Sequence, residues 1–210
     1  MIAPEGVPFV LGAAAVTAAL WFLWPKSLPL AAVALILTAF MAWFFRDPGR
    51  TPPNEPGAVI SPADGKIVFC GDCPPGRYYG EPGKMVSVFM NVFDVHVNRA
   101  PVSGRVVSVR YNPGKFHVAS VDKASLENEQ NGVVLETDGG YKVSYVQIAG
   151  LIARRIVCSL SEGDTVKQGQ RVGMIRFGSR VDIILPASAT LRVKKGGRVR
   201  AGESIVGVLP

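Results

Sequence analysis

The order of hydrophobic and polar residues divides this chain of 210 residues into an apolar beginning and an alternating remainder. Two stretches without a charged residue, 7–24 and 28–45, open the sequence, and only residues 25–27 separate them. Each approaches the roughly 20 apolar residues with which an α-helix crosses the hydrocarbon core of a bilayer. We therefore expect residues 1–45 to form a helical hairpin in a membrane.

The residues that flank the two apolar stretches favour membrane spans over a cleaved signal peptide. A signal peptide needs a basic start and small residues before its cleavage site. In this chain Glu5 is the only charged side chain before the first apolar stretch, and that stretch ends at Trp24. Arg46 and Arg50 follow the second stretch, and positive residues favour the cytoplasmic side. We expect the protein in the cell membrane, with the remainder of the chain on the cytoplasmic side.

Beyond the apolar beginning, the pattern indicates a linker and then a β-rich domain. Residues 46–57 hold four prolines, which favour an extended linker over a helix. From residue 58 to residue 210, short runs of valine and isoleucine alternate with glycine, as in sandwiches and barrels. The runs are 65–68, 104–109, 132–135, 142–146, 172–177 and 181–185. The fold class is therefore expected to be mainly β, and only residues 147–157 are compatible with a helix in this domain.

A short pattern occurs twice toward the end of the chain. Residues 162–169 and 195–202 both contain glycine, then valine three positions later, then glycine three positions after that. Such hairpins are typical of lipoyl and biotinyl domains. The repeat predicts a β-sandwich of two related halves, a barrel-sandwich hybrid.

Charge and cysteine content narrow the range of partners. Residues 1–45 hold one acidic and one basic residue, so the whole net charge of +7 lies in residues 46–210. A basic domain at a bilayer fits anionic phospholipid head groups. The basic run 192–200 lacks the interleaved aromatic residues of single-strand binders, so we expect no nucleic acid. Cys70 and Cys73 lack a second ligand pair, and we expect reduced cysteines and no metal.

Gly178 and Ser179 lie between two of the predicted strands and are the first candidates for chemistry. Glycine and serine are also common turn residues, so a hairpin turn is the alternative. A tight bend here would bring the serine oxygen to the carbonyl of the preceding glycine. That geometry permits an N-to-O acyl shift.

Asp64, His96 and His117 are further candidates for acid–base work. Asp64 lies in a turn before a predicted strand, and alternation would place Asp94, His96 and Asn98 on one strand face. His96 and His117 are the two histidines of the chain, and histidine is the side chain whose ordinary pKa suits proton transfer near neutral pH.

Taken in order, these segments resemble the short form of the phosphatidylserine decarboxylase family, which carries a pyruvoyl group. The resemblance covers nearly the whole chain. It rests on the apolar hairpin and on the segments 45–48 (FRDP), 61–65 (SPADG), 90–101 (MNVFDVHVNRAP), 122–131 (DKASLENEQN), 147–157 and 177–179 (FGS).

The resemblance implies a self-processing enzyme. The bond between Gly178 and Ser179 would break, leaving a β chain of residues 1–178 and an α chain of residues 179–210 that stay associated. Ser179 would become a covalent pyruvoyl group, which forms a Schiff base with phosphatidylserine and releases carbon dioxide to give phosphatidylethanolamine. We assign His96 to reprotonation of the substrate carbon, and Asp64 to assisting cleavage or orienting a partner.

The chain departs from the longer family members in two ways, and two other classes of function remain open. Those members carry Leu-Gly-Ser-Thr at the cleavage site, where this chain has Phe177 and Arg180 around the pair, and a second histidine where this chain has Arg99. The base for cleavage is therefore open. The alternatives are a non-catalytic lipoyl- or biotinyl-like adaptor using Lys123 and a zinc endopeptidase, although the latter needs more histidines. An archaeal-type ether lipid as substrate and a homo-oligomer also remain open.

Overall fold

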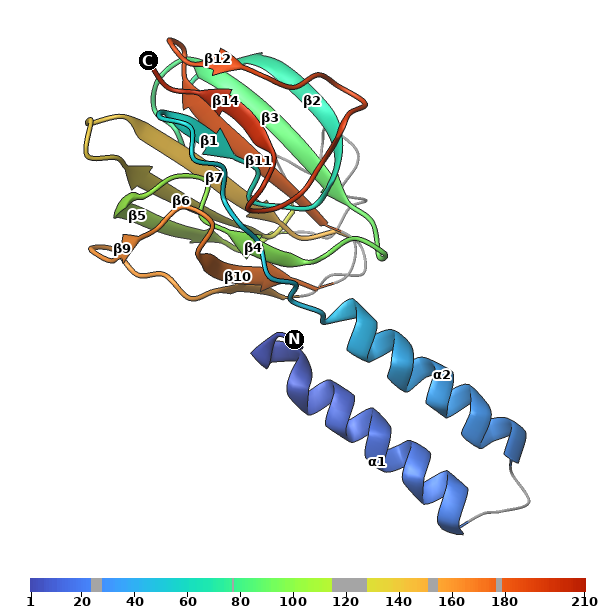
Figure 1. The fold of residues 1–210 in the computed structure, drawn as a ribbon. Helices are drawn as coiled ribbons and strands as arrows, with labels where there is room; N and C mark the ends of the chain where they lie inside the picture. Colours follow the sequence, from blue (N-terminus) through green and yellow to red (C-terminus); the bar gives the residue numbers. More distant parts are fainter. Residues whose placement is uncertain (24–27, 77, 115–127, 151–154, 177–178) are drawn as a thin grey trace. The chain divides into compact units, whose positions relative to one another are not determined.

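The computed structural model describes residues 1–23, 28–76, 78–114, 128–150, 155–176 and 179–210 (Figure 1). The chain divides into two compact units, Met1–Gly49 and Arg50–Pro210.

The first unit is a pair of apolar helices. A 3₁₀ turn, η1 (Pro4–Gly6), leads into α1 (Val7–Leu23), and α2 (Leu28–Phe44) runs back beside it. Between them the hydroxyls of Thr17 and Thr38 lie 3.0 Å apart. The predicted helices over 7–24 and 28–45 therefore coincide with α1 and α2.

The surface of these helices is apolar nearly all round, which suits lipid better than water. α1 has no buried residue, and Phe22 is 77% exposed. Within the described residues, Pro4–Leu23 is the one helix whose length and composition are sufficient to cross a membrane; α2, with 17 residues, is shorter.

The second unit is built from strands, so the prediction of a mainly β fold is confirmed. Its described strands are β1 (Ala58–Ile60), β2 (Gly65–Cys73), β3 (Gly83–Met90), β4 (Val97–Arg99), β5 (Gly104–Asn112), β6 (Gln130–Glu136), β7 (Lys142–Ile148), β8 (Ile156–Cys158), β9 (Thr165–Val166), β10 (Arg171–Ile175), β11 (Ser179–Pro186), β12 (Thr190–Leu191), β13 (Arg198–Val199) and β14 (Ile205–Val208).

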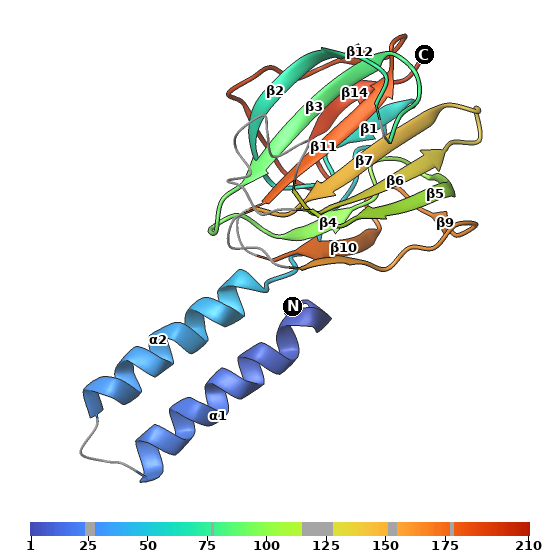
Figure 2. The same ribbon diagram turned by 180° about the vertical axis from the view of Figure 1, so that it is seen from behind.

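These strands form one large curled sheet and two small ones (Figures 1 and 2). The large sheet has the order β13-β2-β3-β11-β7-β6-β5-β9, and the small sheets are β1-β14-β12 and β4-β10-β8. All of the pairings are antiparallel. β11 lies in the middle of the large sheet, between β3 and β7.

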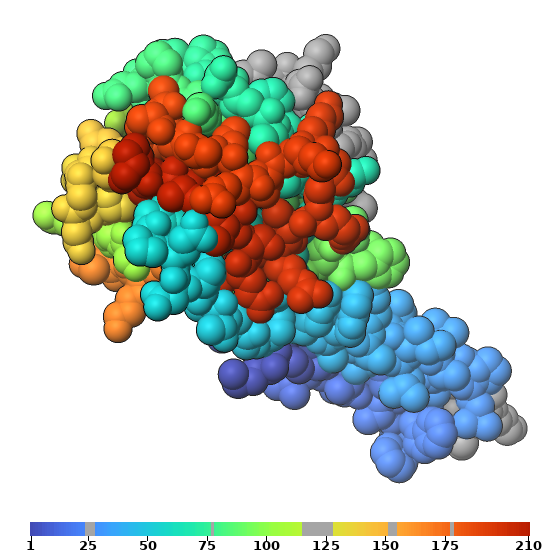
Figure 3. All heavy atoms as spheres, turned by 45° about the horizontal axis from the view of Figure 1, so that its top comes forward, coloured from blue at the N-terminus to red at the C-terminus, as the bar shows by residue number. Residues whose placement is uncertain are grey.

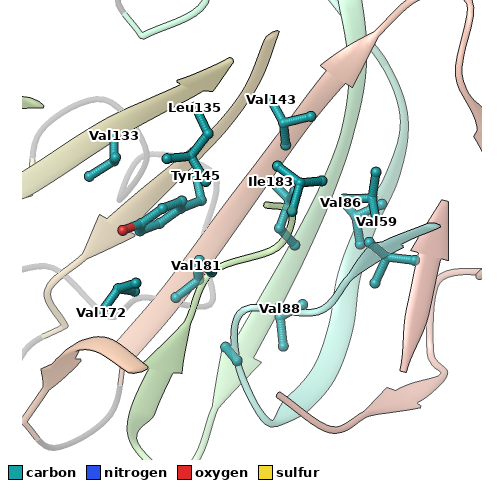
Figure 4. Packing of buried hydrophobic residues seen from close by; sticks show 14 of the residues in the cluster. Val59, Val86, Val88, Val133, Leu135, Val143, Tyr145, Val172, Val181 and Ile183 are labelled. Atoms are coloured by element: carbon teal, nitrogen blue, oxygen red, sulfur yellow. The ribbon is translucent and has the colours of Figure 1, made fainter. Parts of the chain in front are cut away.

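The core lies on the inner face of the large sheet, because alternate residues of each strand point to the same side. On β11 the inward residues include Val181 and Ile183, and on β7 they include Tyr145. Val59 of β1 and Val172 of β10 pack on the same cluster (Figure 4), so the small sheets cover this face. Each large apolar side chain buried here contributes about 1.5–3 kcal/mol.

Two local predictions differ from the structure. Residues 147–157 were compatible with a helix, but the described part of this range contains the end of β7 and the start of β8. β11 begins at Ser179 rather than at residue 181, because pairing with Met90 extends the strand to its first residue. The serine is therefore part of a strand, whereas the sequence predicted it in a bend.

The repeated glycine–valine pattern has the same backbone in both copies. Gly163 and Gly169 have φ values of 93° and 77°, and Gly196 and Gly202 have 91° and 78°. Glycine adopts these left-handed angles without steric cost. The enclosed valines lie in β9 and β13, which form the two opposite edges of the large sheet. The more specific assignment to lipoyl- or biotinyl-like halves stays a prediction.

Candidate active site

Ser179 is the first residue of β11, and its side chain points into the core. It has the same parity as the inward Val181, and it lies opposite Met90 of β3. The residue is fully buried, and its Oγ finds no hydrogen-bond partner among the described residues. A buried unpaired polar group costs about 1–3 kcal/mol, so it needs a chemical explanation. Gly178 lies outside the described residues.

Three buried amide side chains form a hydrogen-bonded chain on the same inner face. Asn131 Nδ2 donates to Gln147 Oε1 at 3.1 Å, and Gln147 Nε2 donates to Asn98 Oδ1 at 2.9 Å. Among the described residues, the contacts of Asn98 Nδ2 are long, 3.5 Å to Pro62 O and 3.9 Å to Met90 Sδ. Because Met90 is the strand partner of Ser179, the amide chain ends with a weakly engaged donor beside the serine position.

His96 is fully buried and directly precedes β4. Its Nδ1 lies 3.0 Å from the carbonyl oxygen of Asp94. Since a carbonyl oxygen only accepts, Nδ1 carries the proton, and Nε2 is the acceptor atom of the neutral ring. The predicted common face holds only in part, because β4 begins at Val97 and Asp94 lies in the turn before it.

The carboxylate of Asp64 is held by two donors. Arg50 Nη2 lies 2.8 Å from its Oδ2, and the backbone N–H of Ala201 donates to its Oδ1 at 2.7 Å. Burial raises the pKa of Asp64, against the lowering effects of the Ala201 N–H and the Arg50 charge. Arg50 also contacts Glu203 at 3.1 Å. Asp64 therefore ties the start of the second unit to its C-terminal segment.

The turn that carries Asp64 lies against β4. The backbone N–H of Arg99 donates to Pro62 O at 3.0 Å, and Asn98 Nδ2 contacts the same oxygen. The negative charge of Asp94 also contributes to the raised pKa of Asp64. The structure thus brings the Asp64 turn, the His96 segment and Asn98 into one neighbourhood, and Asn98 links them to the strand position of Ser179.

A buried ion pair occupies the opposite, outer face of β11. Arg180 Nε donates to Asp182 Oδ1 at 2.6 Å, and its Nη2 donates to Ser87 Oγ at 2.8 Å. The Arg180 and Asp182 side chains are only 3% and 5% exposed. Burial raises the pKa of Asp182, while Arg180 and Ser87 act to lower it.

Gln147, Asn131, Arg180 and Asp182 had no role predicted from the sequence. Their signal was parity: each is a polar residue within or beside a run of valine and isoleucine, at a position that the strand alternation places on a covered face. Parity could not show that Gln147 meets Asn131, because these two residues lie on different strands, β7 and β6.

A cavity of about 820 Å³ lies on the outer face of the large sheet, away from Ser179. Its walls include Gly132 and Lys142, which alternate with the inward Val133 and Val143. Three tyrosines also line it, Tyr78, Tyr79 and Tyr141. Because Ser179 points to the inner face, this cavity is separate from the serine position.

Three candidate residues predicted from the sequence lie outside the described residues: Gly178, His117 and Lys123. Within the described ranges, no three His, Cys, Asp or Glu side chains gather where they could hold a metal ion. Cys70, Cys73 and Cys158 are free thiols.

Comparisons with known proteins agree on one family. The family model for phosphatidylserine decarboxylase matches residues 37–207. The chain is 51% identical over 209 residues to the phosphatidylserine decarboxylase proenzyme of Geotalea uraniireducens (strain Rf4), covering 100% of this chain and 97% of that protein. It is 48% identical over 206 residues to the protein of the same name from Desulfotalea psychrophila, covering 98% of this chain and 95% of the relative. It is 45% identical over 219 residues to the phosphatidylserine decarboxylase proenzyme of Magnetococcus marinus, covering 100% of this chain and 95% of the relative.

The matches to relatives extend over nearly the full length of both proteins, and the range 37–207 of the family model contains Ser179, the amide chain and the His96 segment. The chain therefore belongs to the phosphatidylserine decarboxylase family.

Proposed function

We propose that the chain is a self-processing decarboxylase that converts phosphatidylserine into phosphatidylethanolamine and carbon dioxide at a membrane. The observation that carries the proposal is the buried, unpaired Oγ of Ser179 at the start of β11. Ser144 also has a buried Oγ without a partner among the described residues, so the position of Ser179 directly after Gly178 is what supports a nucleophile here. The family assignment supersedes the adaptor and zinc endopeptidase alternatives.

Self-cleavage would begin with attack of Ser179 Oγ on the carbonyl carbon of Gly178. The peptide nitrogen leaves that carbon and takes up a proton, which converts the amide into an ester. Loss of the α-proton of residue 179 then expels Gly178 as a carboxylate and leaves dehydroalanine. Addition of water to its imine tautomer releases ammonia and leaves a pyruvoyl group. The two chains would be residues 1–178 and 179–210.

The residues around Ser179 fit such a group. Its ketone and amide carbonyls are hydrogen-bond acceptors, and Asn98 Nδ2 is a buried donor whose described contacts are long. Gln147 fixes the Asn98 side chain through its Oδ1, which leaves the amide nitrogen turned away from that bond. When present, a pyruvoyl group supplies an electron sink for the pair released as carbon dioxide leaves.

His96 is assigned to proton delivery to the substrate carbon. The Asp94 carbonyl holds Nδ1–H, so that a proton gained by the ring is carried on Nε2. Burial of the ring keeps this proton away from bulk water. Positioned proton transfer of this kind typically contributes about 10²- to 10⁴-fold to a rate.

Asp64 is assigned to the cleavage step. A carboxylate whose pKa is raised by burial is a stronger base, which suits uptake of the serine proton. Arg99 stands where longer members of the family have a second histidine, and its Nη1 donates to Gly169 O at 3.1 Å. A guanidinium cannot serve as a base. Asp64 is therefore the candidate for accepting the Ser179 proton.

The apolar first unit supports a membrane location. The helix Pro4–Leu23 meets the requirement of length and composition for a span. A phospholipid substrate keeps its acyl chains in the bilayer, so an enzyme that acts on its head group gains from being anchored there. Arg46 and Arg50, which follow α2, favour the cytoplasmic side.

Intact-mass measurement of the purified protein tests the proposal. We expect two species that correspond to residues 1–178 and 179–210, with the small chain lighter than a serine-started peptide by one ammonia. The small chain should also resist reagents that label amino termini. A single full-length species without a small chain would contradict self-processing.

A further inference from the structure

The turn before His96 displays an aromatic side chain at the surface of the second unit. Phe93 is 63% exposed. Single exposed apolar residues are common and carry no inference alone. This one lies on a turn held by its own hydrogen bonds: Phe93 N–H donates to Asn91 Oδ1 at 2.8 Å, and the Asn91 N–H donates to Asp94 Oδ2 at 3.0 Å. The backbone therefore presents Phe93 in a fixed position.

A set of cations lies beside this turn. We define the basic turn as Lys194, Lys195, Arg198 and Arg200, all of which are exposed. Arg198 Nη2 lies 2.6 Å from Asp94 Oδ1, which joins the basic turn to the Phe93 turn. Figure 3 shows the orange to red C-terminal segment spread over one face, with green parts of the earlier chain directly beside it.

Charge within this surface is unbalanced. Arg198 lies directly opposite Lys66 of β2, which is also exposed, and like charges at such positions repel. Asp94 offsets one of these charges, and Glu203, which contacts Arg50, lies 3.9 Å from Arg200. The remaining positive charge can attract an anionic surface.

We propose that Phe93 and the basic turn dock the second unit onto an anionic phospholipid bilayer. An aromatic side chain flanked by lysine and arginine is suited to the interface, where the ring enters the head-group region and the cations meet lipid phosphates. The same turn leads directly into the buried His96, so docking would bring lipid head groups to the candidate active site. The inference rests on the proposed function, in which an anionic phospholipid is the substrate.

The docking can be measured in the full-length protein. The chain has three tryptophans, Trp21, Trp24 and Trp43, and replacing all three by phenylalanine gives a silent background. Phe93→Trp then reports on this surface. Tyr111→Trp is the matched control, because Tyr111 is 60% exposed and lies on β5 in the other half of the large sheet. Both proteins are reconstituted into bilayers rich in phosphatidylglycerol whose acyl chains carry bromine, which quenches tryptophan at close range.

We expect strong quenching for Phe93→Trp and little for Tyr111→Trp. The quenching should weaken in zwitterionic bilayers, at high salt, and when Lys194, Lys195 and Arg200 are changed to glutamine. In those variants the KM for lipid in anionic bilayers should rise by up to about fivefold per cation removed. Equal quenching of both reporters would overturn the proposal, because the bilayer contact would then not be specific to this surface. Absence of quenching at Phe93 would also overturn it and would favour a soluble acidic partner.

The outcome is distinguishable from failure of the proposed function. Self-cleavage, followed by intact mass, and decarboxylation of a short-chain soluble substrate do not require docking. If both proceed and Phe93→Trp is not quenched, docking alone is wrong. If quenching is selective but the protein neither cleaves nor decarboxylates, the surface binds lipid and the proposed function is wrong.

Discussion

Ser179 and Arg180 are neighbours on β11, yet the protein treats their polar groups in opposite ways. Ser179 points to the inner face, where its hydroxyl has no partner among the described residues. Arg180 points to the outer face, where it bonds both Asp182 and Ser87. Both side chains are buried, so both carry a desolvation cost, but only the arginine recovers part of it through hydrogen bonds.

The two neighbours therefore have different roles on one strand: the Ser179 hydroxyl is available for reaction, and Arg180 anchors the strand. A hydroxyl without partners keeps its lone pairs available for attack, whereas a fully bonded ion pair fixes the strand that carries it. β11 is also paired along its length with β3, and from Arg180 to Ile184 with β7. The small chain that follows cleavage would therefore remain in the middle of the sheet.

Replacing Ser179, the reactive residue of the pair, should have the largest effect. Ser179→Ala should abolish self-cleavage, because alanine has no nucleophile. Ser144→Ala is the matched control, since Ser144 is also fully buried, its Oγ also lacks a partner among the described residues, and it lies on the adjacent β7. Intact mass should show one species for the first variant and two for the second. Cleavage in the Ser179 variant would exclude the proposed chemistry.

His96 tests whether the neighbourhood of the serine also serves turnover. His96→Ala should still yield cleaved protein but lose about 10²- to 10⁴-fold in kcat, since proton delivery is removed. His96→Gln keeps a donor for the Asp94 carbonyl without the ability to protonate carbon, so it should behave like the alanine variant. Turnover is measured as carbon dioxide release by the cleaved fraction. A wild-type kcat in either cleaved variant would show that another group supplies the proton.

Replacing Arg180, the anchoring residue of the pair, should affect the free energy of unfolding more than the chemistry. In the uncleaved Ser179→Ala background, Arg180→Met leaves Asp182 buried without its partner and should lower the free energy of unfolding by about 3–5 kcal/mol. Adding Asp182→Leu should restore much of this loss, because the second charge is then also removed. Denaturant unfolding in detergent measures both. A loss below about 1 kcal/mol in the single variant, typical of an exposed pair, would show that Arg180 does not anchor the strand.

The sequence predicted the mainly β class and several of the strands, among them β2, β6 and β11, because runs of valine and isoleucine are a local signal. It did not predict which strands pair. β13 with Arg198 lies beside β2 with Lys66, and β1 joins β14, so these pairings depend on contacts between distant parts of the chain. The same limit applies to the site. Ser179, His96 and Asp64 were candidates by residue type, but the link through Asn98 and Gln147 required the fold.

Replacing Asp64 should have the smallest effect on the free energy of unfolding. Its pH dependence tests whether burial of the Asp64 carboxyl, which raises its pKa, outweighs its pairing with Arg50, which lowers it. Burial raises its pKa above the ordinary value of 3.8, despite the Ala201 N–H and Arg50. The folded state then binds a proton that the unfolded state has already released, so this group makes stability fall as pH rises from about 3.8 through the folded pKa. In the Ser179→Ala background, the unfolding free energy of the parent minus that of Asp64→Asn should therefore decrease over this range and level off above it. An increase with pH would mean that the ion pair with Arg50 outweighs desolvation, and that Asp64 is a weaker base than its proposed part in cleavage needs.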